Sequence, residues 1–257
     1  LKQYIEYTLN LGCLDFLDLY YENKEITIKK NLKNKFSKLI FSCGMIPDYS
    51  HGGGYRTMEL MKSIDTKEKY CFYLRDRESV PVNEILNIFN TNNIKYFDSK
   101  SNEQVSSHFQ TLSDNITIQD LDDFVIYSTW PAGSMAAFDL IAKGKNIYWI
   151  YETMETFSKV FGSLNLDKIE PKKLSLLNTN EILGTIWFEV EKILAIYNDY
   201  LVTMTNEERD YLKNTYRLNK ESLQTIPTAF SSSEEKYISI EKVNNPKLIK
   251  SEGVPKS

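Results

Sequence analysis

The clearest chemical signal in the sequence is a glycine-rich segment that runs from His51 to Arg56. Its three consecutive glycines, Gly52, Gly53 and Gly54, let backbone N–H groups approach a ligand closely, because no Cβ stands in the way. The helix expected to begin here adds the positive end of its dipole, which favours a phosphate or a sugar hydroxyl as the ligand. The segment matches neither GxGxxG nor the P-loop pattern, which argues against a dinucleotide-binding fold and a P-loop ATPase.

The two polar side chains of this segment each have a functional and a structural interpretation. His51 either donates a hydrogen bond to an anionic or hydroxylated ligand or is an exposed loop residue. Arg56, on the first turn of the expected helix, either binds phosphate or forms a salt bridge on the helix face. For the whole segment, the structural alternative is a flexible loop whose glycines serve turn geometry.

A second group of candidates follows other apolar stretches. Glu152 and Glu155 come after residues 147–151, where carboxylates can accept hydrogen bonds from sugar hydroxyls or take up a proton. Acidic residues at a helix N-terminus would explain both without a ligand. Trp130 follows residues 124–128 and either stacks on a sugar ring or packs in the core. We take Glu152 as the candidate catalytic residue and the others as candidate binding residues.

These residues require elements that place them at one edge of a sheet. From residue 38 onward, apolar stretches of strand length alternate with amphipathic helical stretches, which is typical of βαβ units and a parallel sheet. Several expected strands are apolar nearly throughout, as they are when helices cover both faces. We therefore predict an α/β fold with a Rossmann-like, doubly wound parallel sheet. The predicted strands are 39–43, 70–74, 94–97, 124–128, 147–151, 200–204 and 223–226, and the predicted helical faces between them are 58–64, 82–89, 135–141 and 182–197.

The length of 257 residues fits one large domain with additions. Apolar residues from Ile5 to Tyr20, spaced by three and four, predict one helix, which we interpret as a helical extension over 1–35. The α/β domain is predicted at 36–230. The apolar pattern then fades, so 231–257 is interpreted as a linker or tail. Because the first residue is Leu and not Met, we expect the chain to be part of a longer protein.

Composition excludes several classes of protein. Hydrophobic residues make up 42% and charged residues 26%, which is the balance of an ordinary globular protein. A net charge of −4 argues against a nucleic-acid partner. Three distant cysteines and two histidines indicate neither a disulfide framework nor a zinc site, so we expect a reducing compartment. With no apolar run of membrane-spanning length, we expect a cytoplasmic protein, peripheral to a membrane only through the parent protein.

Three stretches, in this order, resemble the N-terminal domain of GT-B glycosyltransferases, closest to glycosyltransferase family 4 and its rhamnosyltransferase-like members. They are 51–57, 148–157, and 201–212 followed by 226–230. The last piece, Ile-Pro-Thr-Ala-Phe, is similar to the closing strand of the family, which ordinarily reads Ile-Pro-Asn-Gly. The resemblance covers about 36–230.

The resemblance implies a retaining enzyme of two Rossmann-like domains that transfers a sugar from a nucleotide-sugar to a glycan or lipid-linked glycan acceptor. Its N-terminal domain mainly binds the acceptor and its C-terminal domain binds most of the nucleotide-sugar. No metal or cofactor is implied, because helix N-termini and basic side chains meet the pyrophosphate charge. By this analogy Gly52, Gly53 and Gly54 lie near the phosphates or the transferred sugar, and Glu152 lies near the acceptor.

Three other motifs have structural explanations. Asp120 and Asp122 resemble the metal-binding DxD of some glycosyltransferases, but they precede a strand instead of following it, so we interpret them as a solvated turn. The E-x7-E spacing of Glu181 and Glu189 falls inside an amphipathic helix without a glycine-rich loop, which points to chance. The run from Thr205 to Glu208 fits a capping box.

The second domain that the resemblance requires is missing from this sequence, so we expect the chain alone to be an incomplete and inactive glycosyltransferase. Two other interpretations stay open. One is a non-catalytic Rossmann-like module that binds a nucleotide or a glycan. The other is an inverting GT-B enzyme or a sugar-nucleotide epimerase, which would take a base from this half.

Overall fold

The computed structural model describes residues 2–23, 37–47, 52–74, 82–99, 107–154, 156–161, 178–219 and 221–227. Its strands are β1 (Lys38–Cys43), β2 (Glu68–Leu74), β3 (Ile94–Ser99), β4 (Phe124–Thr129), β5 (Ile147–Glu152), β6 (Tyr200–Thr203) and β7 (Leu223–Thr225). Its helices are α1 (Lys2–Leu11), α2 (Cys13–Glu22), α3 (Gly52–Ser63), α4 (Val82–Thr91), α5 (His108–Ile118), α6 (Trp130–Ala142), α7 (Phe157–Phe161), α8 (Thr179–Tyr197) and α9 (Asn206–Thr215).

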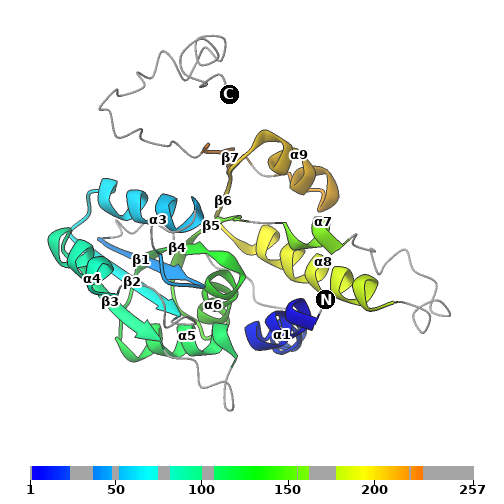
Figure 1. Ribbon diagram of the computed structural model, residues 1–257, viewed down its shortest axis with the longest axis horizontal. Helices are drawn as coiled ribbons and strands as arrows, with labels where there is room; N and C mark the ends of the chain where they lie inside the picture. Colours follow the sequence, from blue (N-terminus) through cyan, green and yellow to red (C-terminus); the bar gives the residue numbers. More distant parts are fainter. Residues whose placement is uncertain are drawn as a thin grey trace, which may run out of the picture. The chain divides into compact units, whose positions relative to one another are not determined.

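The strands form one seven-stranded sheet in the order β3-β2-β1-β4-β5-β6-β7, and every neighbouring pair is parallel (Figure 1). Each of the predicted strands is present, with ends that differ by up to two residues. Helices cover both faces of the sheet, which confirms the predicted doubly wound α/β fold. The compact unit to which they belong ends at Pro227, so the predicted tail lies outside the described residues.

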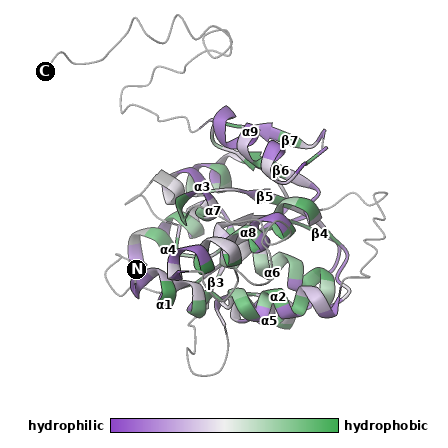
Figure 2. Cartoon of the chain, turned by 90° about the vertical axis from the view of Figure 1, so that its right-hand side faces the viewer, coloured by the Kyte–Doolittle hydropathy of each residue, from purple (hydrophilic) through white to green (hydrophobic). Residues whose placement is uncertain are grey.

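The two faces of the sheet carry separate hydrophobic clusters. On one face, α3 and α4 place Met58, Met61 and Phe89 against side chains of β1 and β2. On the other face, α1, α2, α5, α6 and α8 pack together over the sheet, with Phe138 and Trp187 among their fully buried side chains. Helix α6 is buried from Pro131 to Leu140, whereas α9 is mostly hydrophilic (Figure 2). No helix in the described ranges combines the length and hydrophobicity needed to cross a membrane.

The predicted N-terminal helix is present, but it is divided into α1 and α2 at Gly12. Gly12 has a φ of 79°, which L side chains rarely adopt, and a Cβ there would lie 2.2 Å from the Cβ of Ser107. Leu11 and Phe16 on either side of the break are fully buried in the larger cluster. The two helices are therefore part of the core, although the predicted boundary at residue 35 itself stays a prediction.

The helix caps explain two of the acidic motifs in the sequence. Glu181 forms a reciprocal capping box with Asn178 at the start of α8, so its spacing from Glu189 has a local cause. At the start of α9, the Thr205 hydroxyl accepts a hydrogen bond from the Glu208 backbone N–H, as predicted. The Glu208 carboxylate, however, accepts from the backbone N–H of Met204 at 3.0 Å. Only the N-cap half of the predicted capping box is formed.

Candidate functional site

The order of the strands places a topological switch point between β1 and β4. Connections from β1 proceed toward β2 and β3, whereas connections from β4 proceed toward β5, so the helices that follow β1 and β4 diverge at this point. Ligands of open α/β sheets bind outside the carboxyl ends of the strands at such a point. The predicted site residues follow β1, β4 and β5, which are neighbours in the sheet.

The glycine-rich segment forms the first turn of α3 on the side of β1. Gly52, Gly53 and Gly54 are the first three residues of this 12-residue helix, and Gly54 is buried. The first turn of a helix points its backbone N–H groups and the positive end of the dipole outward, here toward the carboxyl edge of the sheet. His51 lies outside the described residues.

Helix α6 starts directly at the end of β4 and packs very closely on β1. A Cβ at Gly133 would lie 2.1 Å from the carbonyl oxygen of Ser42, so only glycine fits there without a backbone shift. The Ser42 hydroxyl donates to the Gly133 carbonyl at 3.1 Å. Trp130, the first residue of α6, has a φ of 61°, which is uncommon for a bulky residue and which close packing must hold in place. Its side chain is half-buried.

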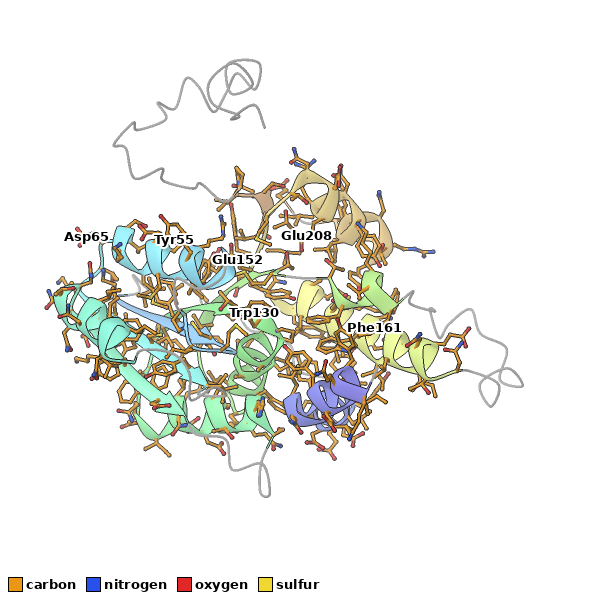
Figure 3. The ribbon with its side chains drawn as sticks, viewed as in Figure 1. Tyr55, Asp65, Trp130, Glu152, Phe161 and Glu208 are labelled. Atoms are coloured by element: carbon orange, nitrogen blue, oxygen red, sulfur yellow. The ribbon has the colours of Figure 1, made fainter. Side chains whose placement is uncertain are left out.

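A buried ion pair joins α3 to β5 on the face of the sheet that α3 covers, opposite to α6. The Arg56 Nε donates to Glu152 Oε1, and the two side chains are only 5% and 0% exposed. Burial raises the pKa of the Glu152 carboxyl, because desolvation outweighs the opposing effect of the Arg56 charge. Arg56 thus makes a salt bridge, but with the sheet beneath α3 and not on the helix face. Figure 3 labels Glu152, Trp130 and the neighbouring Tyr55.

Two hydroxyls from β4 complete this cluster, which we call the switch-point cluster: Arg56, Tyr127, Thr129 and Glu152. Thr129 is the register partner of Glu152, and Tyr127 lies two residues earlier on the same face. Tyr127 also lies close to both charges. Burial raises the pKa of its phenol most strongly, and the negative charge of Glu152 raises that pKa further, whereas the positive charge of Arg56 lowers it. All of these side chains are at most 6% exposed.

The switch-point cluster holds polar atoms that have no hydrogen-bond partner among the described residues. They are Arg56 Nη2, Glu152 Oε2, Tyr127 Oη and Thr129 Oγ1, although the Tyr127 hydroxyl is near enough to Glu152 and Arg56 to interact with both. Buried polar atoms are usually paired, so an unpaired group of this kind calls for an explanation such as a ligand or a bridging water. Its opposite charges cancel, and it offers both hydrogen-bond donors and acceptors. Such a group suits hydroxyls better than a bare anion or cation.

The structure therefore brings together most of the predicted site residues. The glycines, Arg56, Trp130 and Glu152 all lie at the carboxyl ends of β1, β4 and β5. Glu155, like His51, lies outside the described residues. Asp120 and Asp122 lie in the turn before β4, at the opposite edge of the sheet, and Asp122 pairs with Lys145. The described part of the chain contains no group of three or more His, Cys, Asp or Glu side chains that could hold a metal.

Sequence reasoning did not find Tyr127 and Thr129. The available signal was their period-2 spacing in an otherwise apolar stretch, which places both side chains on one face of β4. What could not be read from the sequence is the register that sets Thr129 beside Glu152. No protein-family model matches this chain, and no curated protein matches it.

Proposed function

We propose that this chain is the acceptor-binding part of a GT-B glycosyltransferase, which transfers a sugar from a nucleotide-sugar to a glycan or lipid-linked glycan acceptor with retention of configuration and without a metal. The observation that carries the proposal is the position of the glycine-rich first turn of α3, which adjoins the switch-point cluster at the switch point of the sheet. The sequence resemblance to family 4 enzymes supplies the reaction. The three buried free cysteines support a reducing, cytoplasmic compartment.

The chemistry of this position supports a sugar ligand. A helix N-terminus offers N–H groups to phosphate oxygens or hydroxyls without requiring a metal. The Arg56–Glu152 pair adds no net charge, so it does not favour an isolated anion. Hydroxyls both donate and accept hydrogen bonds, and they match the mixed set of atoms in the switch-point cluster.

We assign roles on this basis. The amides of Gly52, Gly53 and Gly54 face the nucleotide-sugar phosphates or the transferred sugar. Glu152 acts toward the acceptor, with Arg56 holding its carboxylate in place. Trp130 forms an apolar edge of the same site. His51 and Glu155 stay predicted binding residues, since they fall outside the described part of the chain.

The test uses the gene product that contains this chain, incubated with a panel of labelled nucleotide-sugars and glycan acceptors. Gly53→Val should abolish most transfer, because its branched side chain blocks close approach of a ligand to the helix N-terminus. Gly53→Ala should reduce transfer, while its greater helix propensity raises stability by about 0.4–1 kcal/mol. Unchanged transfer by Gly53→Val would refute the role of the loop.

Two further measurements test the rest of the proposal. The anomeric configuration of the product distinguishes retention from inversion. Residues 1–257 alone should show no appreciable turnover, and robust transfer by this chain would contradict its assignment as an incomplete enzyme.

A second candidate function is a non-catalytic module that binds a nucleotide or a glycan. It is favoured by the burial of Glu152, whose side chain is 0% exposed and ion-paired, so that its carboxylate is not open to solvent. This function predicts saturable binding of the same ligands, measured by calorimetry, with no transfer by the gene product. Measurable transfer would exclude it.

A further inference from the structure

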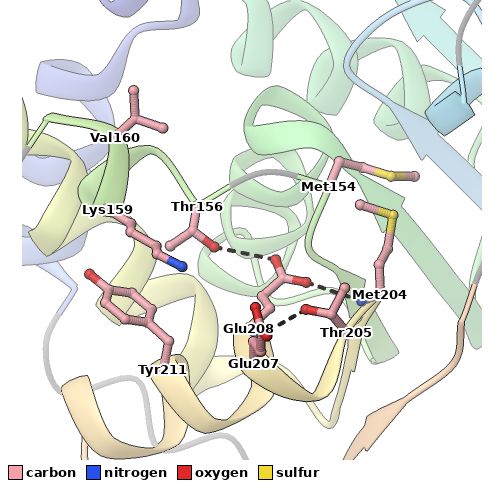
Figure 4. A pocket seen from close by; sticks show the side chains of 9 residues that line it. All are labelled: Met154, Thr156, Lys159, Val160, Met204, Thr205, Glu207, Glu208 and Tyr211. Carbon is pink, nitrogen blue, oxygen red and sulfur yellow. Dashed lines mark hydrogen bonds between the residues drawn. The ribbon is translucent and has the colours of Figure 1, made fainter.

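A concave surface lies at the carboxyl edge of the sheet, away from the switch point. It is a pocket of about 280 Å³ between α7 and α9, reached from the ends of β5 and β6 (Figure 4). Its walls include Met154 and Met204 on one side and Lys159 and Tyr211 on the other. We call it the α7–α9 pocket.

The apolar part of the pocket is formed where two strands end side by side. The Thr153 N–H donates to the Val202 carbonyl at 3.0 Å, which continues the β5–β6 pairing beyond β5. Met154 follows Thr153 directly and Met204 comes two residues after Val202, so the two side chains reach the pocket from neighbouring strand ends. Thioethers and an aromatic ring are polarizable surfaces that pack well on the C–H face of a ring-shaped ligand.

The charges in the pocket are mixed. Glu208 is already engaged, since its carboxylate accepts from the Met204 N–H at 3.0 Å and from the Thr156 hydroxyl at 3.3 Å. Glu207 is exposed, and its side chain takes part in no salt bridge or hydrogen bond with another described residue. Lys159 is also exposed, and its ammonium lies 5.7 Å from the centre of the Tyr211 ring.

This balance of charge selects one class of ligand. Two carboxylates and one ammonium give the pocket a net charge of −1, which repels phosphates and nucleotides. A cationic ligand would find only one unengaged carboxylate, Glu207, opposed by Lys159. A neutral ring with hydroxyls would instead donate a hydrogen bond to Glu207 and accept one from Lys159, and both bonds would be charge-assisted. We propose that the α7–α9 pocket binds a single uncharged pyranose unit, with Met154, Met204 and Tyr211 against its C–H surface and with Lys159 and Glu207 on its hydroxyls.

One wall of the pocket is held in place before any ligand arrives. Helix α7 has only five residues, and buried Glu191 accepts hydrogen bonds from the backbone N–H groups of Phe157 and Ser158 at its start. The Ser158 hydroxyl also lies 3.4 Å from the Tyr211 hydroxyl of α9. A wall fixed in this way lowers the ordering cost of binding.

The proposal concerns binding at one pocket and does not require sugar transfer. If the proposed glycosyltransferase function is correct, the pyranose is a unit of the acceptor. The two ideas fail separately, because transfer is measured by product formation whereas this site is measured by direct binding to the chain.

Methyl NMR of the chain labelled at the methionine ε-carbons provides the binding measurement. The chain has six methionines, of which Met154 and Met204 line the pocket, while Met58, Met61 and Met135 are fully buried elsewhere and report on nonspecific change. Methyl glucopyranoside, methyl mannopyranoside and methyl rhamnopyranoside are titrated separately, with uridine diphosphate as the anionic comparison. At least one glycoside should shift the two pocket signals saturably at millimolar concentration, and uridine diphosphate should not.

Matched variants test the assigned contacts. Glu207→Gln and Lys159→Met should each weaken glycoside binding by about fivefold to tenfold, since each loses a charge-assisted hydrogen bond. Glu22→Gln, an exposed change on α2, should leave binding unchanged. The proposal is overturned if no glycoside shifts the Met154 and Met204 signals, if uridine diphosphate shifts them instead, or if binding is indifferent to both pocket variants.

Discussion

Replacement of Glu191 by Gln tests the balance between burial and hydrogen bonding at the start of α7. The Glu191 carboxylate lies in α8 and is 5% exposed. It accepts hydrogen bonds from the Phe157 N–H at 2.5 Å and the Tyr216 hydroxyl at 2.9 Å, and also from the Ser158 N–H and hydroxyl. These donors lower its pKa, but burial raises it more strongly, to about 7 from an ordinary value of 4.5.

The sign of the pH effect follows from this raised pKa. The folded protein binds the Glu191 proton more tightly than the unfolded chain, so the contribution to stability is full below pH 4.5 and is lost as pH rises through about 7. A difference of about 2.5 pH units, at about 1.36 kcal/mol each, corresponds to about 3 kcal/mol. In Glu191→Gln the side chain is neutral at every pH, and its amide can still donate to the Ser158 and Tyr216 hydroxyls.

The assay is urea unfolding of the wild type and of Glu191→Gln at a series of pH values, because the difference between their unfolding free energies cancels the titration of shared groups. Relative to wild type, the variant should gain about 3 kcal/mol between about pH 4.5 and pH 8. The exposed change Glu22→Gln should show no such gain. A pH-independent difference would show that Glu191 keeps an ordinary pKa, and a loss with rising pH would show that the hydrogen-bond donors outweigh burial.

Two substitutions at the switch point should lower stability for different reasons. Gly133→Ala should cost about 1–3 kcal/mol in urea unfolding, because the added Cβ meets the Ser42 carbonyl oxygen and forces the backbone apart; wild-type stability would show that α6 can move away freely. Arg56→Met should cost about 3–5 kcal/mol at neutral pH, since Glu152 then keeps a buried and unpaired charge. The double variant Arg56→Met/Glu152→Gln should recover part of that loss. If Arg56→Met alone were as stable as wild type, Glu152 would already be protonated in the folded protein.

The sheet was predictable because its signal is local. In β1, every residue from Leu39 to Cys43 is buried, and such an apolar run bounded by polar residues is typical of a parallel strand covered on both faces. The carboxyl-edge position of the glycine segment followed from the same pattern. Helix α8 was likewise visible as a long 3.6-residue period of apolar positions.

The rest depends on contacts between distant residues. Arg56 and Glu152 are 96 residues apart, and their pairing requires both the orientation of α3 and its place over β5. The sequence therefore left Arg56 with two possible partners. The break at Gly12 was missed because a glycine inside an amphipathic stripe is tolerated in many helices. The close approach of Ser107, which leaves no room for a Cβ, comes from a residue 95 positions away.

The hydrogen bond from the Trp187 indole to the Thr8 hydroxyl, at 3.1 Å, also bears on the order of folding. The two residues are 179 positions apart, so during synthesis α1 and α2 must wait for α8 to emerge. At about 5–20 residues per second this delay is on the order of 10–40 s. Phe16 can meet Phe109 of α5 and Phe138 of α6 earlier, but the part of the surface that α8 supplies to the first two helices is missing throughout that time. Completion of this docking is therefore a late event in the life of the nascent chain, and a chaperone that protects the first two helices has a defined interval in which to act.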